Sequence, residues 1–158
     1  MKFWDTSAVV PVLVVEAGTR VVRSLLKDDP GIVVWWGTRV ECVSALARQV
    51  RERGMRTADL TAAQKRLAGL TDRWSEIIPS EALRSSAERI VRIHPLPAAD
   101  AVQLAAALIA SDGQPATLPF VSLDVRLREA ARREGFVVLP EVMPTPGAVP
   151  ERARRRRT

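Results

Sequence analysis

Short apolar segments alternate with longer helical segments along most of the chain, and this alternation constrains the fold more than any other feature. One apolar segment, Ile32–Trp36, contains no polar residue, which is typical of a strand covered on both faces of a parallel sheet. By the same reasoning we predict strands at Lys2–Trp4, Ile32–Trp36, Phe120–Leu123 and Phe136–Leu139, with a further short strand at Ile77-Ile78.

The segments between these strands have apolar residues at helical spacing. Asp5-Thr6-Ser7 suits the start of a first helix, because all three residue types cap helix N-termini. The other helices are predicted at about Thr19–Lys27, Thr38–Arg53, Thr61–Trp74, Ser80–Ile93, Ala98–Ala110 and Arg126–Glu134. In the second of these the predicted buried stripe is Val40, Val43, Leu46, Ala47 and Val50. Strands alternating with helices predict a three-layer α/β/α fold: a short-stranded parallel sheet with helices on both faces.

Length and composition suit one folded domain with a distinct tail. The chain has 158 residues, of which 47% are hydrophobic, enough for one sizeable core. We expect this domain over residues 1–140 and a disordered tail over 141–158, first Pro-rich and then Arg-rich. The longest apolar stretch, Ala8–Val15, is far shorter than the roughly 20 residues of a membrane helix. A lone cysteine, Cys42, cannot form an internal disulfide, so a cytoplasmic location is expected.

Four acidic residues occupy strand ends or the first turn of a helix: Asp5, Glu41, Asp100 and Asp124. Each has a structural explanation. Asp5 and Asp124 could be helix N-caps, Thr38 and Glu41 fit a capping box, and Asp100 could favour the helix dipole. These explanations do not account for the set, because all four would meet at the carboxyl edge of the sheet, where ligands bind. Neighbouring carboxylates repel, so either some are protonated or a cation is present. Oxygen ligands suit Mg²⁺ or Mn²⁺.

The residues around these acids resemble the PIN-domain ribonucleases, and among them the VapC-type toxins of bacterial toxin–antitoxin pairs. The resemblance spans about residues 1–140 and is carried by Asp5-Thr6-Ser7-Ala8, Val40-Glu41, the segment 98–107 (AADAVQLAAA) and the segment 120–127 (FVSLDVRL). It implies a Mg²⁺-dependent endoribonuclease that is usually a homodimer and is held inactive by a cognate antitoxin. It also implies that Asp5, Glu41, Asp100 and Asp124 hold the metal, which would activate water against an RNA phosphodiester.

The resemblance extends to supporting residues. Thr6 and Ser7 are expected to orient Asp5, and Ser122 is expected to support the same acids. Arg39 and Arg126 stand next to acids in the sequence and could hold flanking RNA phosphates, although solvated helix surface explains them equally well. No organic cofactor and no membrane contact are expected.

Several other residues have structural explanations. Trp35 and Trp36 could stack on bases but are assigned to the core, while Cys42 and His94 are predicted to be structural. The helices between residues 61 and 93 carry more apolar surface than a helical hairpin can bury, and a dimer or antitoxin contact is placed there. The residues concerned are Leu67, Leu70, Trp74 and Leu83, and ordinary core packing is the competing explanation.

Two other functions compete with the nuclease. A non-catalytic PIN-type module that binds RNA or acts as a scaffold would lack one or more of the four acids, and none is missing here. Phosphoaspartate chemistry at Asp5 is disfavoured, because the phosphatases that use it need a second aspartate where this chain has Ser7. Receiver domains need a lysine where it has Pro140.

Overall fold

A five-stranded parallel sheet lies at the centre of the computed structural model, which describes residues 1–144. Its strand order is β3-β2-β1-β4-β5, and Phe3 at its centre pairs with Val33 on one side and Phe120 on the other. The strands are β1 (Lys2–Trp4), β2 (Ile32–Trp35), β3 (Ser75–Ile77), β4 (Phe120–Val121) and β5 (Val138–Leu139). The predicted short-stranded parallel sheet is therefore confirmed.

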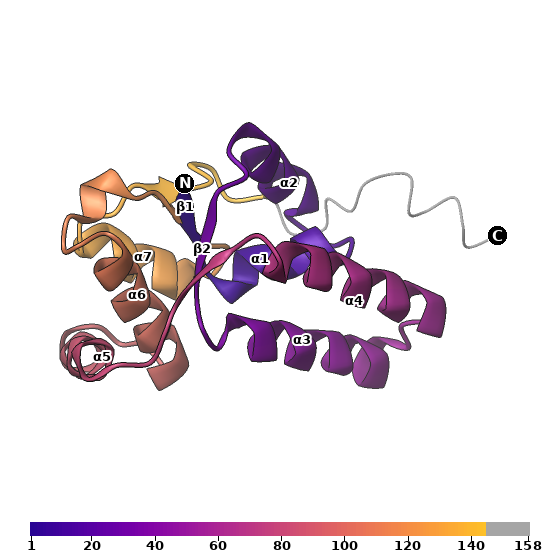
Figure 1. Cartoon of the computed structure of the whole chain (residues 1–158), viewed down its shortest axis with the longest axis horizontal. Coiled ribbons are helices and arrows are strands. Elements are labelled where there is room, and N and C mark those ends of the chain that lie inside the picture. Colours follow the sequence, from indigo (N-terminus) through magenta and orange to yellow (C-terminus); the bar gives the residue numbers. More distant parts are fainter. Residues whose placement is uncertain (145–158) are drawn as a thin grey trace.

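Helices cover both faces of this sheet (Figure 1). One face carries α1 (Thr6–Leu13), α2 (Thr19–Asp28), α3 (Thr38–Arg53) and α4 (Thr57–Thr71). The other carries α5 (Glu81–Ile93), α6 (Ala98–Ala110) and α7 (Val125–Arg133), and a short 3₁₀ turn at Pro115–Thr117 precedes β4. This is the predicted three-layer α/β/α arrangement. No helix within residues 1–144 is both long and apolar enough to cross a membrane.

Strand residues divide alternately between two hydrophobic cores. Phe3 packs with α5, α6 and α7, whereas the next residue, Trp4, packs with α1 to α4. Val33 and Val34 divide in the same way, as do Phe120 and Val121. Successive side chains of a strand point to opposite faces, so a sheet with helices on both sides needs apolar residues at consecutive positions.

Two burial predictions are wrong. Val40, Val43 and Val50 of the predicted stripe are exposed, with Val40 at 64%, whereas Leu46 is buried as predicted and packs with Cys42 against α1 and α4. The three valines and the pair Cys42 and Leu46 each have helical spacing, and only the packing decides which set meets the core. Trp36, predicted to lie in the core, is 51% exposed because β2 ends at Trp35 and the chain turns away there.

Most element boundaries agree with the sequence to within a few residues. The largest shift is at α4, which begins at Thr57 rather than near Thr61. Gly54, in the left-handed conformation, ends α3, and Arg56 pairs with Asp59 across the first turn of α4. The predicted tail at 141–158 lies mostly outside the described residues, so it and the domain boundary at 140 stay predictions.

Candidate active site

The four predicted acids line one cavity of about 810 Å³ at the carboxyl edge of the sheet. Asp5 follows β1, Asp124 lies shortly after β4, and Glu41 and Asp100 lie in the first turns of α3 and α6. The chain leaves β1 toward β2, while β4 lies on the opposite side of β1, so the strand order reverses between β1 and β4. Ligands of open parallel sheets bind at such a reversal.

Asp5 is both the N-cap of α1 and a buried wall of the cavity. Its Oδ1 accepts a hydrogen bond from the Ser7 backbone N–H (2.6 Å) and its Oδ2 accepts one from the Ser7 hydroxyl (2.7 Å). Burial raises the pKa of Asp5 to about 6, although hydrogen bonds from Ser122 and Ser7 act in the opposite direction. The capping role therefore does not exclude a functional one.

Ser7 connects the two strands that flank the reversal. Besides donating to Asp5, its Oγ accepts hydrogen bonds from the backbone N–H groups of Leu123 (2.8 Å) and Asp124 (3.1 Å). The Ser122 hydroxyl lies 3.3 Å from it, and the Asp124 carboxylate caps α7 through the Leu127 N–H. Ser7 and Ser122 thus hold Asp5 and Asp124 in register, in agreement with the predicted supporting positions.

Glu41 is held by side chains from three other elements. Its Oε2 accepts hydrogen bonds from the Thr6 hydroxyl and from Gln103 Nε2 (2.7 Å), and its Oε1 accepts one from Trp35 Nε1 (3.3 Å). Thr6 therefore supports Glu41 rather than Asp5. The predicted capping box does not form, because the N-cap of α3 is Gly37 and the Glu41 carboxylate points to other partners.

Gln103 is a site residue that the sequence pattern did not single out. Its amide nitrogen also donates to Thr6 Oγ1 (2.8 Å), which closes a triangle of Gln103, Thr6 and Glu41. Gln103 lies three residues after Asp100 on α6, and both line the cavity. Helical spacing from Asp100 could therefore have identified it.

Asp100 is the least constrained of the four acids. It is half-buried, and among residues 1–144 no group donates a hydrogen bond to its carboxylate. Burial raises its pKa, with further contributions from Asp124 and Glu41, while the nearby Arg126 acts in the opposite direction. The predicted repulsion between neighbouring carboxylates is therefore present in this cavity.

The predicted phosphate-binding arginines do not line the cavity. Arg39 and Arg126 are both exposed outside it, although Arg126 is close enough to affect Asp100. The cationic residues of the wall are instead Arg48 and Arg53 of α3. Proximity to an acid in the sequence does not place a side chain in this cavity, because adjacent residues of a helix point in directions about 100° apart, and RNA contacts at Arg39 and Arg126 stay a prediction.

The chemistry of the wall fits a hard divalent cation. The four acids provide only oxygen donors and repel one another, and a bound cation would relieve this repulsion. Within residues 1–144, however, no three acidic, histidine or cysteine side chains are already gathered closely enough to bind a metal ion. Binding would therefore require some of these side chains to turn, and the Asp100 carboxylate accepts no hydrogen bond from the described residues that would oppose this.

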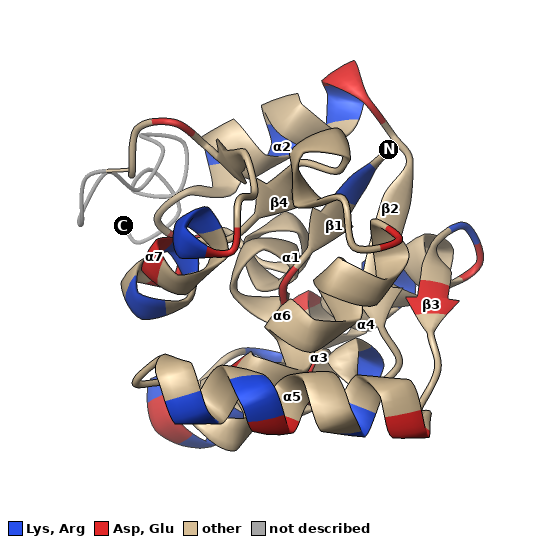
Figure 2. Ribbon diagram, turned by 90° about the vertical axis from the view of Figure 1, so that its left-hand side faces the viewer, with Lys and Arg blue, Asp and Glu red and all other residues tan. Residues whose placement is uncertain are grey.

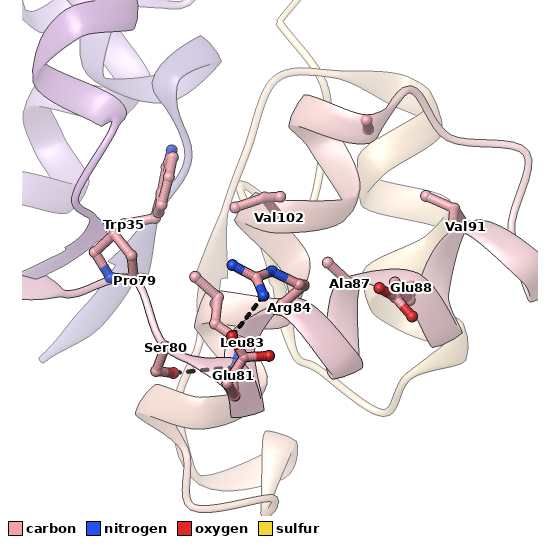
Figure 3. A pocket seen from close by; sticks show the side chains of 11 residues that line it. Trp35, Pro79, Ser80, Glu81, Leu83, Arg84, Ala87, Glu88, Val91 and Val102 are labelled. Carbon is pink, nitrogen blue, oxygen red and sulfur yellow. Dashed lines mark hydrogen bonds and ion pairs between the residues drawn. The ribbon is translucent and has the colours of Figure 1, made fainter.

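A second, mostly apolar hollow of about 480 Å³ lies between α5, the start of α6 and Trp35 (Figure 3). Leu83, Ala87, Val91 and Val102 line it together with Trp35, whose indole N–H donates to Glu41. Charges of both signs follow one another along the ribbon of α5 (Figure 2).

The apolar residues predicted to form a docking surface belong to the core. Leu67, Leu70, Trp74 and Leu83 are all buried, so ordinary core packing, the competing explanation, accounts for them. His94, predicted to be structural, is buried against Glu134 (2.7 Å) away from the cavity, and Cys42 is also buried.

Replacing Asp5 with asparagine is expected to stabilise the metal-free protein by about 1–3 kcal/mol at pH 7.5. The pKa of Asp5 is higher in the folded than in the unfolded chain, so the folded state binds its proton more tightly. Stability is therefore lost as the pH rises from about 4 to 6, and an uncharged asparagine avoids this loss. Urea unfolding in EDTA should show the gain at pH 7.5 and little of it at pH 4. The exposed Asp28→Asn is the control, and an equal gain at both pH values would contradict the argument.

Replacing Ser7 with alanine is expected to lower the RNA cleavage that the sequence resemblance predicts about 10- to 100-fold, because Asp5 and Asp124 lose a shared support. It should also cost about 1–3 kcal/mol, since the Leu123 N–H loses its partner and the Asp124 N–H keeps only the Ser122 hydroxyl. Single-turnover cleavage and urea unfolding measure the two effects. Ser44→Ala is the matched control, since Ser44 lines the same cavity and its hydroxyl forms no hydrogen bond with the described residues. Equal rates for the two variants would refute the supporting role.

The fold has a counterpart among solved structures. The crystal structure of FitAcB from Neisseria gonorrhoeae superposes with a TM-score of 0.61 over 87% of this chain and 96% of that chain, at 17% sequence identity. FitB is a PIN-domain protein, so the likeness confirms the predicted PIN-like fold. No protein-family model matches the sequence, and a search of curated proteins gives no significant match. At this sequence identity the comparison supports the fold alone.

Proposed function

We propose that this protein is a metal-dependent endoribonuclease that uses Mg²⁺, for which Mn²⁺ can substitute, and acts as a toxin neutralised by a cognate antitoxin. One observation carries the proposal: four carboxylates from separate segments of a PIN-like fold meet in one cavity, where the strand order reverses. The resemblance of the sequence to VapC-type toxins supports the toxin role, and it is also the basis for expecting an antitoxin, a homodimer and a cytoplasmic location.

Asp5, Glu41, Asp100 and Asp124 would hold the cation. When bound, it would lower the pKa of a water molecule and neutralise charge on the phosphate under attack. Ser7 fixes Asp5, while Thr6, Trp35 and Gln103 fix Glu41, so two of the acids are already oriented. Asp100 and Asp124 would complete the set, with Asp124 keeping its place through its cap on α7.

A non-catalytic RNA-binding or scaffold module is the second candidate. It is favoured by the fact that no three potential metal ligands in residues 1–144 are gathered in binding geometry. The presence of all four acids and their mutual repulsion favour the nuclease, because a scaffold gains nothing from like charges in one cavity.

Cleavage of total cellular RNA by the purified protein tests the nuclease. Reactions with Mg²⁺ or Mn²⁺ should give discrete fragments, and EDTA should abolish them. Asp100→Asn, purified in parallel, excludes a contaminating nuclease. If no metal supports cleavage, calorimetry of Mg²⁺ and Mn²⁺ binding decides the next step. Binding without cleavage would point to a narrow RNA target, and no binding would favour the scaffold.

A further inference from the structure

A row of polar and charged side chains extends the acidic cavity along α3, and the proposed cleavage does not use it. From Glu41 its members form two adjacent series, 44-48-52 and 49-53, each spaced by three or four residues, which places them on one face of the helix. Together with the acids it lines the same 810 Å³ cavity; its members are Ser44, Arg48, Gln49, Glu52 and Arg53.

Two members of this row, Arg48 and Arg53, are cations with no ion-pair partner among residues 1–144. Both side chains are exposed to solvent. The carboxylate that both of them influence is that of Glu16, whose pKa is raised by burial even though the two arginines act to lower it. Glu16 itself accepts a long hydrogen bond from Gln49 (3.4 Å). The two guanidinium groups therefore remain available to an external anion.

We propose that Arg48 and Arg53 bind backbone phosphates of the RNA on one side of the bond to be cut. This inference rests on the proposed function and identifies how the same cavity takes its substrate. An α-helix rises 1.5 Å per residue, so Arg48 lies about 10 Å and Arg53 about 18 Å from Glu41 along α3. The cations thus form a track that leads to the acids. The guanidinium group of arginine can donate two parallel hydrogen bonds to phosphate oxygens, which suits it to this role.

The chemistry of the cavity favours a polynucleotide over an acidic peptide. The track ends at four carboxylates, which with a bound cation suit phosphodiester chemistry. A flexible single strand can place one phosphate at the acids and its neighbours on the arginines. Such contacts hold the backbone and carry no base preference.

Binding of a fluorescein-labelled random 12-mer of single-stranded RNA tests the inference. Anisotropy is measured in Mg²⁺ from 50 to 300 mM KCl, in an Asp100→Asn background that keeps the RNA intact. We expect Arg48→Gln and Arg53→Gln each to weaken binding about fivefold at 100 mM KCl and to reduce the salt slope by about 0.7. The double variant should reduce the slope by about 1.4, and Arg→Lys at either position should restore most of it.

Arg51→Gln is the matched control, because Arg51 is exposed in the last turn of α3, as Arg53 is, but does not line the cavity. In the otherwise unaltered protein, the arginine variants should raise KM with little change in kcat, since phosphate contacts bind ground and transition states alike. Thermal melting must show that all variants fold.

The outcomes separate this inference from the nuclease proposal. Binding within twofold of the parent, or a loss equal to that of Arg51→Gln, would overturn the role of the two arginines, and so would a parent that does not bind the 12-mer. Arginine-dependent binding by a protein that neither cleaves RNA nor binds Mg²⁺ or Mn²⁺ would support the track and refute the nuclease. Arginine-dependent binding of polyglutamate but not of RNA would reassign the track to an acidic peptide.

Discussion

The Asp100→Asn variant is expected to cleave RNA about 10²- to 10³-fold more slowly than the parent while unfolding at the same denaturant concentration or a slightly higher one. Asp100 lines the cavity beside Asp124 and Glu41, so its charge belongs to the proposed metal-binding set. Its carboxylate accepts no hydrogen bond from the described residues. Replacing it therefore removes a proposed metal ligand without removing a hydrogen bond that stabilises the fold. Single-turnover cleavage in Mg²⁺ and urea unfolding measure the two properties separately.

Toxicity in growing cells tests the same assignment of the acids. Expression of the parent should arrest growth, whereas expression of Asp100→Asn or Asp5→Asn should be tolerated. Asp112→Asn is the control, since Asp112 lies exposed in a loop and its positive φ suits asparagine. Equal toxicity of the parent and the Asp100 variant would refute the catalytic assignment.

Arg128→Met is expected to destabilise the protein by about 3–5 kcal/mol, and to lower Tm by roughly 10 °C. Arg128 is 2% exposed, and its guanidinium donates to the backbone carbonyls of Ser122 (2.6 Å), Leu139 (2.9 Å) and Pro140. Methionine fills much of the same space but leaves the carbonyls of Ser122 and Pro140 without a donor, which costs more than the lost hydrogen bonds alone, while Leu139 keeps the Ser122 N–H. Thermal melting and urea unfolding at pH 7.5 provide the measurement.

A change at the neighbouring Arg132 controls for the loss of one positive charge from α7. Arg132 is exposed in the last turn, so Arg132→Met should cost less than about 1 kcal/mol. A cost below about 1 kcal/mol for Arg128→Met as well would show that the carbonyls of Ser122 and Pro140 find other partners. Cleavage by Arg128→Met should also fall, because Arg128 holds the segment from Ser122 to Asp124 against the end of β5.

Much of the fold and the four acids could be predicted from local sequence. Strands buried on both faces leave runs without polar residues, as in Ile32–Trp35, and helices leave periodic patterns that bracket α6 at the same two residues, Ala98 and Ala110. In a parallel sheet, the carboxyl ends of all strands lie at one edge. The predicted strands alone therefore place Asp5 and Asp124 at the same edge of the sheet.

The partners of these acids could not be predicted in the same way. Gln103 and Thr6 are 97 positions apart, and their hydrogen bond exists only because the fold brings both residues to the same cavity. For the same reason, the sequence pairs Thr6 with its neighbour Asp5, whereas in the folded chain Thr6 holds Glu41. The place of Arg48 beside the acids could have been predicted, because its spacing of seven residues from Glu41 already implies a shared helix face.

The sequence by itself therefore determined the order of strands and helices, the two-sided burial of the sheet and the meeting of four acids at one edge. The tertiary structure alone decided which face of α3 enters the core, which side chains hold Glu41, and that Arg128 secures the strand ends. The physical reason is the range of the interactions. Periodicity and turn chemistry act over a few residues. By contrast, the choice between two apolar faces of a helix and the hydrogen-bond partner of a buried polar group are decided only when distant segments pack together.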